Sequence, residues 1–569
     1  MDSKKFLLVL DDVWGEDREK WIELKNLLMG GANGSNILVT TRSPRAASMM
    51  GTVSPYNLDG LPHKGCLSLF VKWAFDEGRE MQHANLVEIG NEIVKKCKGV
   101  PLVVKSLGSL LYSNFVKDND TWNLNKKEGD ILSALQLSYT QMPSYLKQCV
   151  TYCSLFPKDY QYNSFELIRL WMAHGLLQSH NENHELEDIG NQYVDELYSR
   201  SFIEDYRDIG YFRAFKMHDL AHDLALSVAQ SECLIIDCQT QNISKKVWHL
   251  SYFDNTWQNE NVFKGLQKSK TIQTIFCPIK GVGPSSESFV DACITEFRYL
   301  RVLDLGDSCF KVLPRSIGTM KHLRQLDLSR NCRITKLPNF ICKLQNLQAL
   351  LLQGCEKLEE LPKDIRYMIS PRWLEKTTKQ KSTRDLLSLP ETFNSLRVLG
   401  LSNCRNLKSL FEVVLDYMGL RVLLIEGCGD LISLFPALKC LTTLEVLYIE
   451  NCENLDLVVR EGSQEEFTMS LQVLCISELP QLEVLPQWIK WPARTLQHMT
   501  IQGCPNLEAL PNLESLAELA IVDCPKLLSL PVCLPVLRFF TISECPKLSR
   551  SCQLPIGKNW HKIAHASEI

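Results

Sequence analysis

Residues 420–428 read LRVLLIEGC, and the same spacing of apolar residues returns along the second half of the chain. Leu423 and Ile425 stand two positions apart, so both side chains would point to one face of a strand. Cys428 follows Ile425 by three residues. The stretch therefore predicts a short strand with one buried face, followed by a turn that directs a small thiol inward.

Pairs of strand positions of this kind recur from Leu300 onward. Their first members are separated by 23, 24, 49, 24, 24, 27, 25, 20 and 21 residues, and the step of 49 hides one irregular repeat between Met368 and Leu387. This spacing is the period of leucine-rich repeats, about 20 to 29 residues. The pairs are Leu303/Leu305, Leu326/Leu328, Leu350/Leu352, Leu399/Leu401, Leu423/Ile425, Leu447/Ile449, Leu474/Ile476, Met499/Ile501, Leu519/Ile521 and Phe540/Ile542.

A column of cysteines accompanies the strand pairs, three residues after the second apolar position, where the repeat template places Asn or Cys. A side chain there faces inward and satisfies backbone groups of the stacked turns. The column explains about a third of the 22 cysteines without redox or metal chemistry. Its members are Cys355, Cys404, Cys428, Cys452, Cys504, Cys524 and Cys545.

Stacked repeats form a curved surface that contacts partners through the side chains between the strand apolars. These side chains are mixed in charge and chemistry, which favours a protein partner over a polyanion. Residues 372–390 form a local basic stretch that we interpret as a solvated loop. The expected surface positions are Asp304, Asp327, Glu445, Tyr448, Gln497, Thr500 and Phe539, and the basic side chains are Arg372, Lys376, Lys379, Lys381 and Arg384.

The start of the chain carries a different pattern. Residues 6–10 are apolar at every position and end in Asp11 and Asp12, as in a Walker B strand that helices cover on both faces. A second apolar strand at 36–42 would complete a strand-helix-strand unit and bring Arg42 to the same edge of the sheet. An acid pair after a strand is also common as a turn or helix cap. The joint pattern predicts an edge that handles phosphate and Mg²⁺.

Helical patterns fill the region between the two ends. Gly99-x-Pro101 interrupts one amphipathic helix and starts another, which is also an ordinary structural use of proline. Residues 130–225 contain short amphipathic helices with apolar residues three and four apart. A winged helix could bind DNA, but residues 130–177 are not markedly basic and Trp171 fits a core position. Cys149 and Cys153 are better explained as buried thiols than as metal ligands, because no second pair stands at ligand spacing.

Five motifs occur in one order along the chain, and together they resemble the signature of plant NLR disease resistance proteins. These combine a coiled-coil type NB-ARC region with leucine-rich repeats, and Trp14 after the acid pair resembles the coiled-coil class. The resemblance covers nearly the whole chain. The motifs are residues 6–14, 34–42, 99–102, 149–159 and Met217-His218-Asp219.

The resemblance implies a nucleotide site for ADP or ATP with Mg²⁺. Asp11 would hold Mg²⁺ if a Walker A loop is supplied, and Asp12 would polarise water if hydrolysis occurs. Arg42 would sense the γ-phosphate, Pro101 would pack on the adenine, and His218 would contact the β-phosphate of ADP. His218 also fits a structural role at the start of a helix. The implied nucleotide-binding residues are Asp11, Asp12, Arg42, Pro101, Leu102 and His218; no catalytic residue and no enzyme activity are expected.

We therefore expect a multidomain α/β chain: a partial P-loop NTPase-like sheet, a small helical domain, a winged-helix domain and a leucine-rich repeat solenoid. The motif G-x-x-x-x-G-K-[ST] does not occur, so we expect an N-terminally truncated member that starts at Walker B, without the Walker A half. The expected boundaries are 1–56 for the nucleotide-binding part, 57–125 for the helical NB-ARC subdomain, 126–228 for the winged helix, 229–290 for a linker and repeat cap, and 291–569 for the repeats.

Composition narrows the function. A net charge of −4 disfavours nucleic acid as a partner, and no apolar run reaches the length of about 18 residues that a membrane span needs. The cysteines fit reduced thiols in the cytoplasm. The favoured hypothesis is an intracellular immune receptor of plant defence, in which an ADP/ATP switch is biased by repeats that recognise a pathogen effector or a guarded host protein. The alternatives are a truncated receptor fragment that only binds protein through its repeats, and a slow ATPase.

Overall fold

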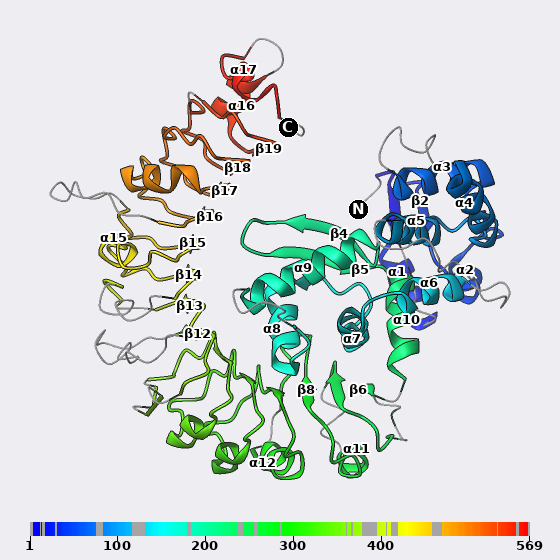
Figure 1. The fold of residues 1–569 in the computed structure, drawn as a ribbon, viewed down its shortest axis with the longest axis horizontal. Helices are drawn as coiled ribbons and strands as arrows, with labels where there is room; N and C mark the ends of the chain where they lie inside the picture. Colours follow the sequence, from blue (N-terminus) through cyan, green and yellow to red (C-terminus); the bar gives the residue numbers. More distant parts are fainter. Residues whose placement is uncertain are drawn as a thin grey trace. The chain divides into compact units, whose positions relative to one another are not determined.

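The chain forms two compact units, residues 1–108 and 109–569, and each is treated by itself (Figure 1). Among the residues that the structure describes, no helix combines the length and the hydropathy that a membrane span requires. The computed structural model describes residues 4–11, 13, 18–28, 31–75, 84–115, 131–178, 184–230, 232–236, 240, 243–254, 260–284, 287–359, 361–362, 364–365, 368–377, 395–404, 407–410, 419–457, 469–531, 533–553 and 557–566.

The first unit begins with two parallel strands, β1 (Leu7–Leu10) and β2 (Asn36–Val39), which α1 (Arg18–Leu28) connects. The predicted strand-helix-strand unit is confirmed. The expectation that helices cover both faces of β1 is wrong for the described residues. Leu7 and Val9 are 68% and 52% exposed, because alternate residues of a strand point to opposite faces and α1 contributes no buried residue.

Helices form the rest of this unit: α2 (Pro44–Met50), α3 (His63–Ala74), α4 (Ala84–Lys96) and α5 (Pro101–Phe115). The predicted interruption is confirmed, since α4 ends at Lys96 and α5 starts at Pro101. Gly99 adopts a φ of +78°, and a Cβ on it would lie 2.9 Å from the backbone of Gly60. The backbone N–H of Leu61 donates to the carbonyl of Gly99 at 2.8 Å, so this turn requires glycine at close approach.

The second unit opens with the winged-helix region. The helices predicted around Tyr139, Cys149 and Trp171 are confirmed, and Trp171 is fully buried. Three short antiparallel strands form a sheet in the order β3-β5-β4. The elements are α6 (Ile131–Thr140), α7 (Ser144–Cys153), β3 (Tyr162–Asn163), α8 (Ser164–His174), α9 (Leu186–Ser199), β4 (Ile203–Asp208), β5 (Arg213–Met217) and α10 (Asp219–Ala229).

The repeats stack fourteen described strands into one parallel sheet that follows an arc, with α8, α9 and the β4–β5 hairpin on its concave side (Figure 1). Residues 229–290, expected as a linker and cap, contribute its first three strands. The strands are β6 (Cys233–Ile236), β7 (His249–Tyr252), β8 (Thr274–Phe276), β9 (Val302–Asp304), β10 (Gln325–Asp327), β11 (Ala349–Leu352), β12 (Trp373–Thr377), β13 (Val398–Ser402), β14 (Val422–Glu426), β15 (Val446–Glu450), β16 (Val473–Ser477), β17 (His498–Gln502), β18 (Glu518–Val522) and β19 (Phe539–Ser543).

Short helices lie among the repeat turns and after the last strand. They are α11 (Glu260–Leu266), α12 (Glu287–Glu296), α15 (Phe435–Leu438), α16 (Pro546–Cys552) and α17 (Trp560–Ile563), with 3-10 helices η3 (Arg315–Thr319), η4 (Asn339–Lys343) and η6 (Gln487–Arg494).

The register of the repeats is the one that the sequence period predicts. Leu423 pairs with Leu399 on one side and with Leu447 on the other. The step of 49 contains β12, whose Leu374 pairs with Leu350 and with Leu399. The irregular repeat is therefore a full member of the sheet.

The cysteine column is buried, as predicted. Cys355 donates its thiol to the carbonyl of Leu328 in the preceding turn at 3.0 Å, and Cys428 donates to the carbonyl of Leu401 at 3.7 Å. Burial raises the pKa of Cys355 to about 12, so its thiol stays protonated at neutral pH. All cysteines in the described part of the chain are free thiols.

Candidate functional site

The carboxyl ends of β1 and β2 are tied together in the first unit. Thr40 donates its hydroxyl to Asp11 Oδ1, and the backbone N–H of Val13 donates to the carbonyl of Thr40 at 2.9 Å. Thr41 Oγ1 donates to the carbonyl of Val13 at 2.5 Å. Asp11 thus stands at the sheet edge where open α/β sheets place ligands. Asp12 and Trp14 lie outside the described residues.

The other candidate nucleotide-binding residues of this unit lie at, or just before, the starts of two helices. Arg42 is exposed in the loop between β2 and α2, where Ser43 caps α2 by accepting from the backbone N–H of Ala46 at 3.1 Å. Pro101 is exposed at the first position of α5, whereas Leu102 beside it is buried. The exposure of Arg42 and Pro101 permits contact with a ligand, while Leu102 contributes to the helical core.

His218 belongs to the second unit, where it caps the N-terminus of α10. Its Nδ1 accepts from the backbone N–H of Leu220 at 3.2 Å, so the neutral ring carries its proton on Nε2. Nε2 lies 3.8 Å from Glu204 Oε2. The ring therefore offers its remaining N–H on the side of a carboxylate, and its helix-start role is present in the structure.

Sequence reasoning missed two further residues of α10, His222 and Asp223. They connect the motif at 149–159 to the helix that follows the motif at 217–219. His222 Nε2 lies 2.8 Å from the carbonyl of Phe156, and burial lowers the pKa of His222. Lys158 Nζ lies 2.6 Å from Asp223 Oδ1. Since His222 stands four residues after His218, one helical turn, the spacing was a signal that could have found it.

A column of arginines connects the repeats to the winged-helix region. Its five members are arginines that stand directly before a repeat strand and contact the winged-helix region. Arg301 donates to the carbonyl of His174 at 2.8 Å, and Arg324 donates to the carbonyl of Ala173 at 3.3 Å. These carbonyls belong to the last turn of α8, where a helix favours cations. The five are Arg301, Arg324, Arg372, Arg397 and Arg421.

The next members of the column bind carboxylates at the start of α9. Arg372 donates two hydrogen bonds to Glu187, of 3.1 and 2.7 Å, and also contacts Glu185. Arg397 Nε donates to Glu185 at 3.0 Å. Burial would raise the pKa of Glu185, but hydrogen bonds from Arg372 and Arg397 hold that pKa below its usual value.

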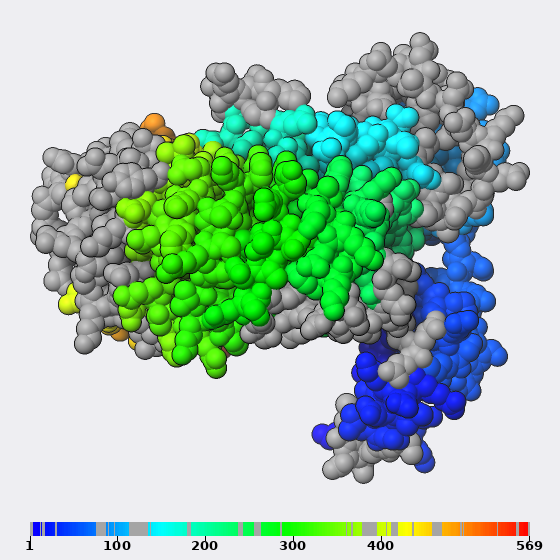
Figure 2. Space-filling model, turned by 90° about the horizontal axis from the view of Figure 1, so that it is seen from below, coloured from blue at the N-terminus to red at the C-terminus, as the bar shows by residue number. Residues whose placement is uncertain are grey.

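Arg421 completes the column by bridging two carboxylates. It binds Asp188 through two hydrogen bonds of 3.0 and 2.9 Å, and it reaches Glu445 on the next repeat at 2.9 and 2.6 Å. Figure 2 shows the cyan winged-helix residues and the green repeat residues forming one continuous surface. The column therefore docks the winged-helix region on the concave side of the repeats.

This docking corrects the expectation of a solvated basic loop at 372–390. Arg372 is ion-paired with α9, and Lys376 takes an inward position in β12 between Leu352 and Leu401. Lys376 is 1% exposed, and burial lowers its pKa to about 8. The strand continues the sheet and removes both side chains from solvent. Lys379, Lys381 and Arg384 lie outside the described residues.

Four of the expected surface positions are also corrected. Asp304 is only 7% exposed, and its carboxylate accepts from the backbone N–H groups of Gly306 and Cys277. The other three are half-buried because the winged-helix region covers this part of the concave side; the four are Asp304, Asp327, Glu445 and Tyr448. Gln497 and Phe539 are exposed and Thr500 is half-buried, beyond the arginine column.

A buried histidine, His174, and a half-buried one, His249, lie where α8 meets the first repeat strands. Thr274 Oγ1 lies 2.8 Å from His174 Nε2 and 2.9 Å from His249 Nδ1, and the Tyr152 ring packs against both imidazoles. Burial lowers the pKa of His249 to about 4 and holds that of His174 well below its usual range. Both rings are therefore neutral at pH 7.

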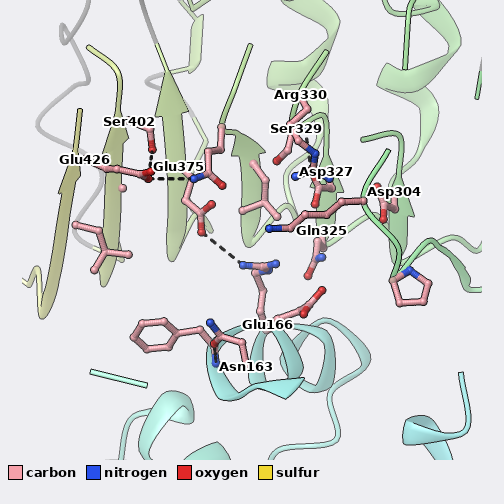
Figure 3. Close-up of a pocket in the computed structure, with 18 of the residues that line it drawn as sticks. Asn163, Glu166, Asp304, Gln325, Asp327, Ser329, Arg330, Glu375, Ser402 and Glu426 are labelled. Carbon is pink, nitrogen blue, oxygen red and sulfur yellow. Dashed lines mark hydrogen bonds and ion pairs between the residues drawn. The ribbon is translucent and has the colours of Figure 1, made fainter. Parts of the chain in front are cut away.

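A cavity of about 470 Å³ lies between α8 and the outward faces of β9–β15 (Figure 3). A second cavity of about 290 Å³ lies beside it, lined by the start of α9, the β4–β5 hairpin and strands β13–β17. Both are built by the winged-helix region and the repeats together.

Three family models match the chain. Residues 1–80 match the NB-ARC domain, residues 155–225 match the disease resistance protein winged helix domain, and residues 284–553 match the leucine-rich repeat region. The class is therefore a nucleotide-binding-type region followed by a winged helix and leucine-rich repeats, and the fold class expected from the sequence is confirmed.

The relatives are plant proteins. "Disease resistance protein RGA2" of Solanum bulbocastanum is 40% identical over 63% of this chain and 34% of its own length. "Putative disease resistance RPP13-like protein 1" of Arabidopsis thaliana is 35% identical over 61% of this chain and 34% of its own. The chain spans about a third of the length of these curated relatives. The three matches and these relatives make the chain similar to plant disease resistance proteins with NB-ARC and leucine-rich repeat regions, as the sequence motifs indicate.

Among solved structures, a leucine-rich repeat protein of Leptospira interrogans aligns with 53% of this chain and 81% of its own, at 18% identity and a TM-score of 0.35. A likeness of this size carries no argument about function.

Proposed function

We propose that the chain acts in plant defence as the switch and recognition part of an intracellular immune receptor, located in the cytoplasm. The similarity to plant disease resistance proteins supports this proposal. One structural observation carries it further: the arginine column joins the repeats, which would bind a partner, to α8 and α9 of the winged-helix region. A partner that binds one arrangement of these parts more tightly than another would shift the equilibrium between them.

The nucleotide roles are part of the proposal. Asp11 would hold Mg²⁺ and Asp12 would face the attacking water. Arg42 would sense the terminal phosphate of ATP, and Pro101 would pack on the adenine. The position of Asp11 beside Thr40 at the sheet edge and the exposure of Arg42 and Pro101 support these roles.

His218 and Leu102 complete the proposed ADP contacts. His218 accepts from the backbone N–H of Leu220 through Nδ1, and its Nε2–H would donate to a phosphate oxygen when ADP is bound. Leu102 is buried, so its contribution would be to hold the first turn of α5, and with it Pro101, in place. We propose a switch with no catalytic turnover of its own.

The partner would be a protein, a pathogen effector or a guarded host protein, bound by the repeats beyond the arginine column. The exposed side chains of Gln497 and Phe539 and the half-buried Thr500 support this surface. Their mixture of amide, aromatic and hydroxyl groups suits a protein better than a nucleic acid.

Equilibrium dialysis of radiolabelled ADP against the purified chain tests the switch. We expect one saturable site that weakens when Asp11→Asn removes the carboxylate charge. His218→Asn is the sharper variant, because asparagine keeps an N-cap acceptor for α10 while removing the imidazole donor.

Asp430→Asn serves as a matched control, since it removes one carboxylate charge far along the repeats, and it should leave ADP affinity unchanged. Absence of saturable ADP binding would contradict nucleotide switching in this chain and would favour the alternative of a module that only binds protein. A separate incubation of the purified chain with ATP and Mg²⁺ tests the slow ATPase, which release of ADP and phosphate would favour.

A further inference from the structure

The 470 Å³ cavity between α8 and the repeats has a strong excess of acidic side chains. Its volume falls in the range of small-molecule sites, about 300 to 1,000 Å³. Arg169, Lys280 and Arg330 are the cationic residues of its lining. Figure 3 shows carboxylates on the strands facing Glu166 on α8. The acidic residues are Glu166, Asp304, Asp327, Glu375, Glu426 and Glu450.

Two of these cations are engaged in ion pairs. Arg330 binds Asp307, a carboxylate outside the lining, through hydrogen bonds of 2.9 and 2.7 Å. Arg169 Nη1 lies 3.6 Å from Glu375 Oε1. The lining therefore keeps more negative than positive charge, and a cation entering it would be attracted.

A neutral side chain gives an independent indication of a ligand. Gln325 projects from β10 toward α8 and is 2% exposed (Figure 3). Its amide oxygen accepts no hydrogen bond from any residue that the structure describes. Buried acceptors are ordinarily satisfied, so a hydrogen-bond donor at this position would complete the site.

The carboxylates form a line rather than a cluster. Asp327 on β10 and Glu375 on β12 belong to one row of the sheet, two strands apart, which corresponds to about 10 Å. Glu426 and Glu450 pair on the adjacent strands β14 and β15, about 5 Å apart. No group of three or more His, Cys, Asp or Glu side chains is arranged for a metal ion in the described part of the chain. An extended ligand with several positive charges fits this spacing better than a single metal ion.

We propose that this cavity binds a linear aliphatic polyamine of the spermidine class. Its ammonium groups would lie against Asp327, Glu375 and the Glu426–Glu450 pair, and one would donate to the amide oxygen of Gln325. At the far end, the rings of Tyr211 and Tyr448, whose centroids are 4.8 Å apart, would cover the methylene chain.

Binding would release protons. Burial and the neighbouring Asp327 raise the pKa of Asp304 to about 8, and burial raises the pKa of Glu166. Asp304 therefore holds a proton at neutral pH, and a bound ammonium would lower its pKa and expel that proton. Proton release gives a readout that simple attraction to a negative surface does not give.

Lys280 provides a second, independent test of polyamine binding in this cavity. Its exposed side chain also lines the cavity and acts electrostatically on Glu166, so its positive charge would repel a cation that enters. Replacing it with the uncharged methionine should tighten polyamine binding. Because Lys280 is exposed, Lys280→Met should leave the fold intact.

Isothermal titration of the full chain with spermidine, in two buffers of different ionisation enthalpy, tests the proposal. We expect one saturable site whose heat differs between the buffers at pH 7. Glu375→Gln and Glu426→Gln should each weaken binding by about tenfold, and Lys280→Met should strengthen it. Glu508→Gln, at an exposed carboxylate outside the cavity, is the charge-matched control and should bind as the parent chain does.

Four results would overturn the proposal: no saturable heat, equal weakening by Glu508→Gln, no change or a weakening on Lys280→Met, or binding of a basic peptide where spermidine fails. If Glu375→Gln lowers the melting temperature, the result for Lys280→Met decides. ADP plays no part in these titrations, so the outcome is independent of the proposed nucleotide switch.

Discussion

The repeats under the winged-helix region and the repeats beyond it have the same interior and different outward faces. In the covered part, β14 buries Leu423 and Ile425; in the open part, β18 buries Leu519 and Ile521 in the same register. The residues on the outward faces of the two parts have different contacts. Arg421 before β14 binds α9 and the next repeat, whereas Arg538 at the same position before β19 is exposed. Inward positions stack the repeats, and outward positions decide what lies against them.

The largest expected effect should be the same in both parts. Leu423→Ala and Leu519→Ala each remove a fully buried side chain, which costs about 2 to 5 kcal/mol of unfolding free energy. Urea denaturation, with amide hydrogen exchange to assign the loss to β14 or β18, measures it. A loss several times larger in the covered part would mean that the winged-helix region also supports the interior, contrary to this comparison.

A fall in pH should destabilise the repeats around His249 and stabilise those around His498. Burial lowers the pKa of His249 to about 4, so its stabilising contribution is complete above pH 6.5 and is lost as the pH falls, by about 3 kcal/mol at pH 4. At β17, where the β4–β5 hairpin lies against the repeats, the hydrogen bond to Glu518 raises the pKa of His498, whose contribution is complete below pH 6.5 and is lost as the pH rises.

Hydrogen exchange in β7–β8 and in β17–β18 between pH 7.5 and pH 5 separates these effects. His249→Gln should flatten the acid response of β7–β8, and His498→Gln should flatten the response of β17–β18. His561→Gln, at an exposed histidine of α17, is the control and should change neither. Identical pH profiles in the two regions would contradict the assignment.

An arginine directly before a repeat strand should contribute to stability only where the winged-helix region covers it. Arg372→Ala leaves Glu187 without its arginine and Glu185 with Arg397 alone, and it should cost about 2 kcal/mol, whereas Arg538→Ala should cost less than about 0.5 kcal/mol. Thermal unfolding measures both values, and limited proteolysis between α8 and α9 reports release of the docked helices. Restored protection in Arg372→Glu combined with Glu187→Arg would attribute the effect to this pair.

The smallest expected effect on stability concerns the glycine turns that follow the repeat strands. Gly427 and Gly503 adopt φ values of +63° and +61° after their strands, and each N–H donates to the next repeat at 2.9 and 3.0 Å. Alanine at either position should cost about 1 kcal/mol, because a Cβ disfavours left-handed backbone. The denaturant midpoint should fall for both variants and further for Gly427→Ala, because its Cβ would lie 2.6 Å from Asn403 Oδ1, whereas the Cβ of Gly503→Ala would lie 3.3 Å from the Glu478 side chain. Equal shifts would show that the Asn403 side chain moves aside at no cost.

Much of the repeat architecture was accessible from the sequence. The pairs from Leu303 to Phe540, the hidden strand β12 and the inward cysteines all follow from a period that acts between neighbouring repeats. The site at the chain's start was accessible in part: Asp11 lies at the sheet edge, while the roles of Asp11, Arg42, Pro101 and His218 toward a nucleotide stay predictions.

The chain by itself determined which residues face inward, because burial of a strand's alternate side chains depends on residues one repeat away. It did not determine that Arg372 binds Glu187 or that Arg421 binds Asp188, since these partners are 185 and 233 residues apart and no period relates them. Only the tertiary structure, by laying α8 and α9 on the repeats, turned Asp304 from a surface residue into a buried one and created the acidic cavity. The physical reason is that α8 and α9, which are distant in the sequence, exclude water from the outward faces of the repeats. Neither the spacing of residues nor the composition predicts this exclusion.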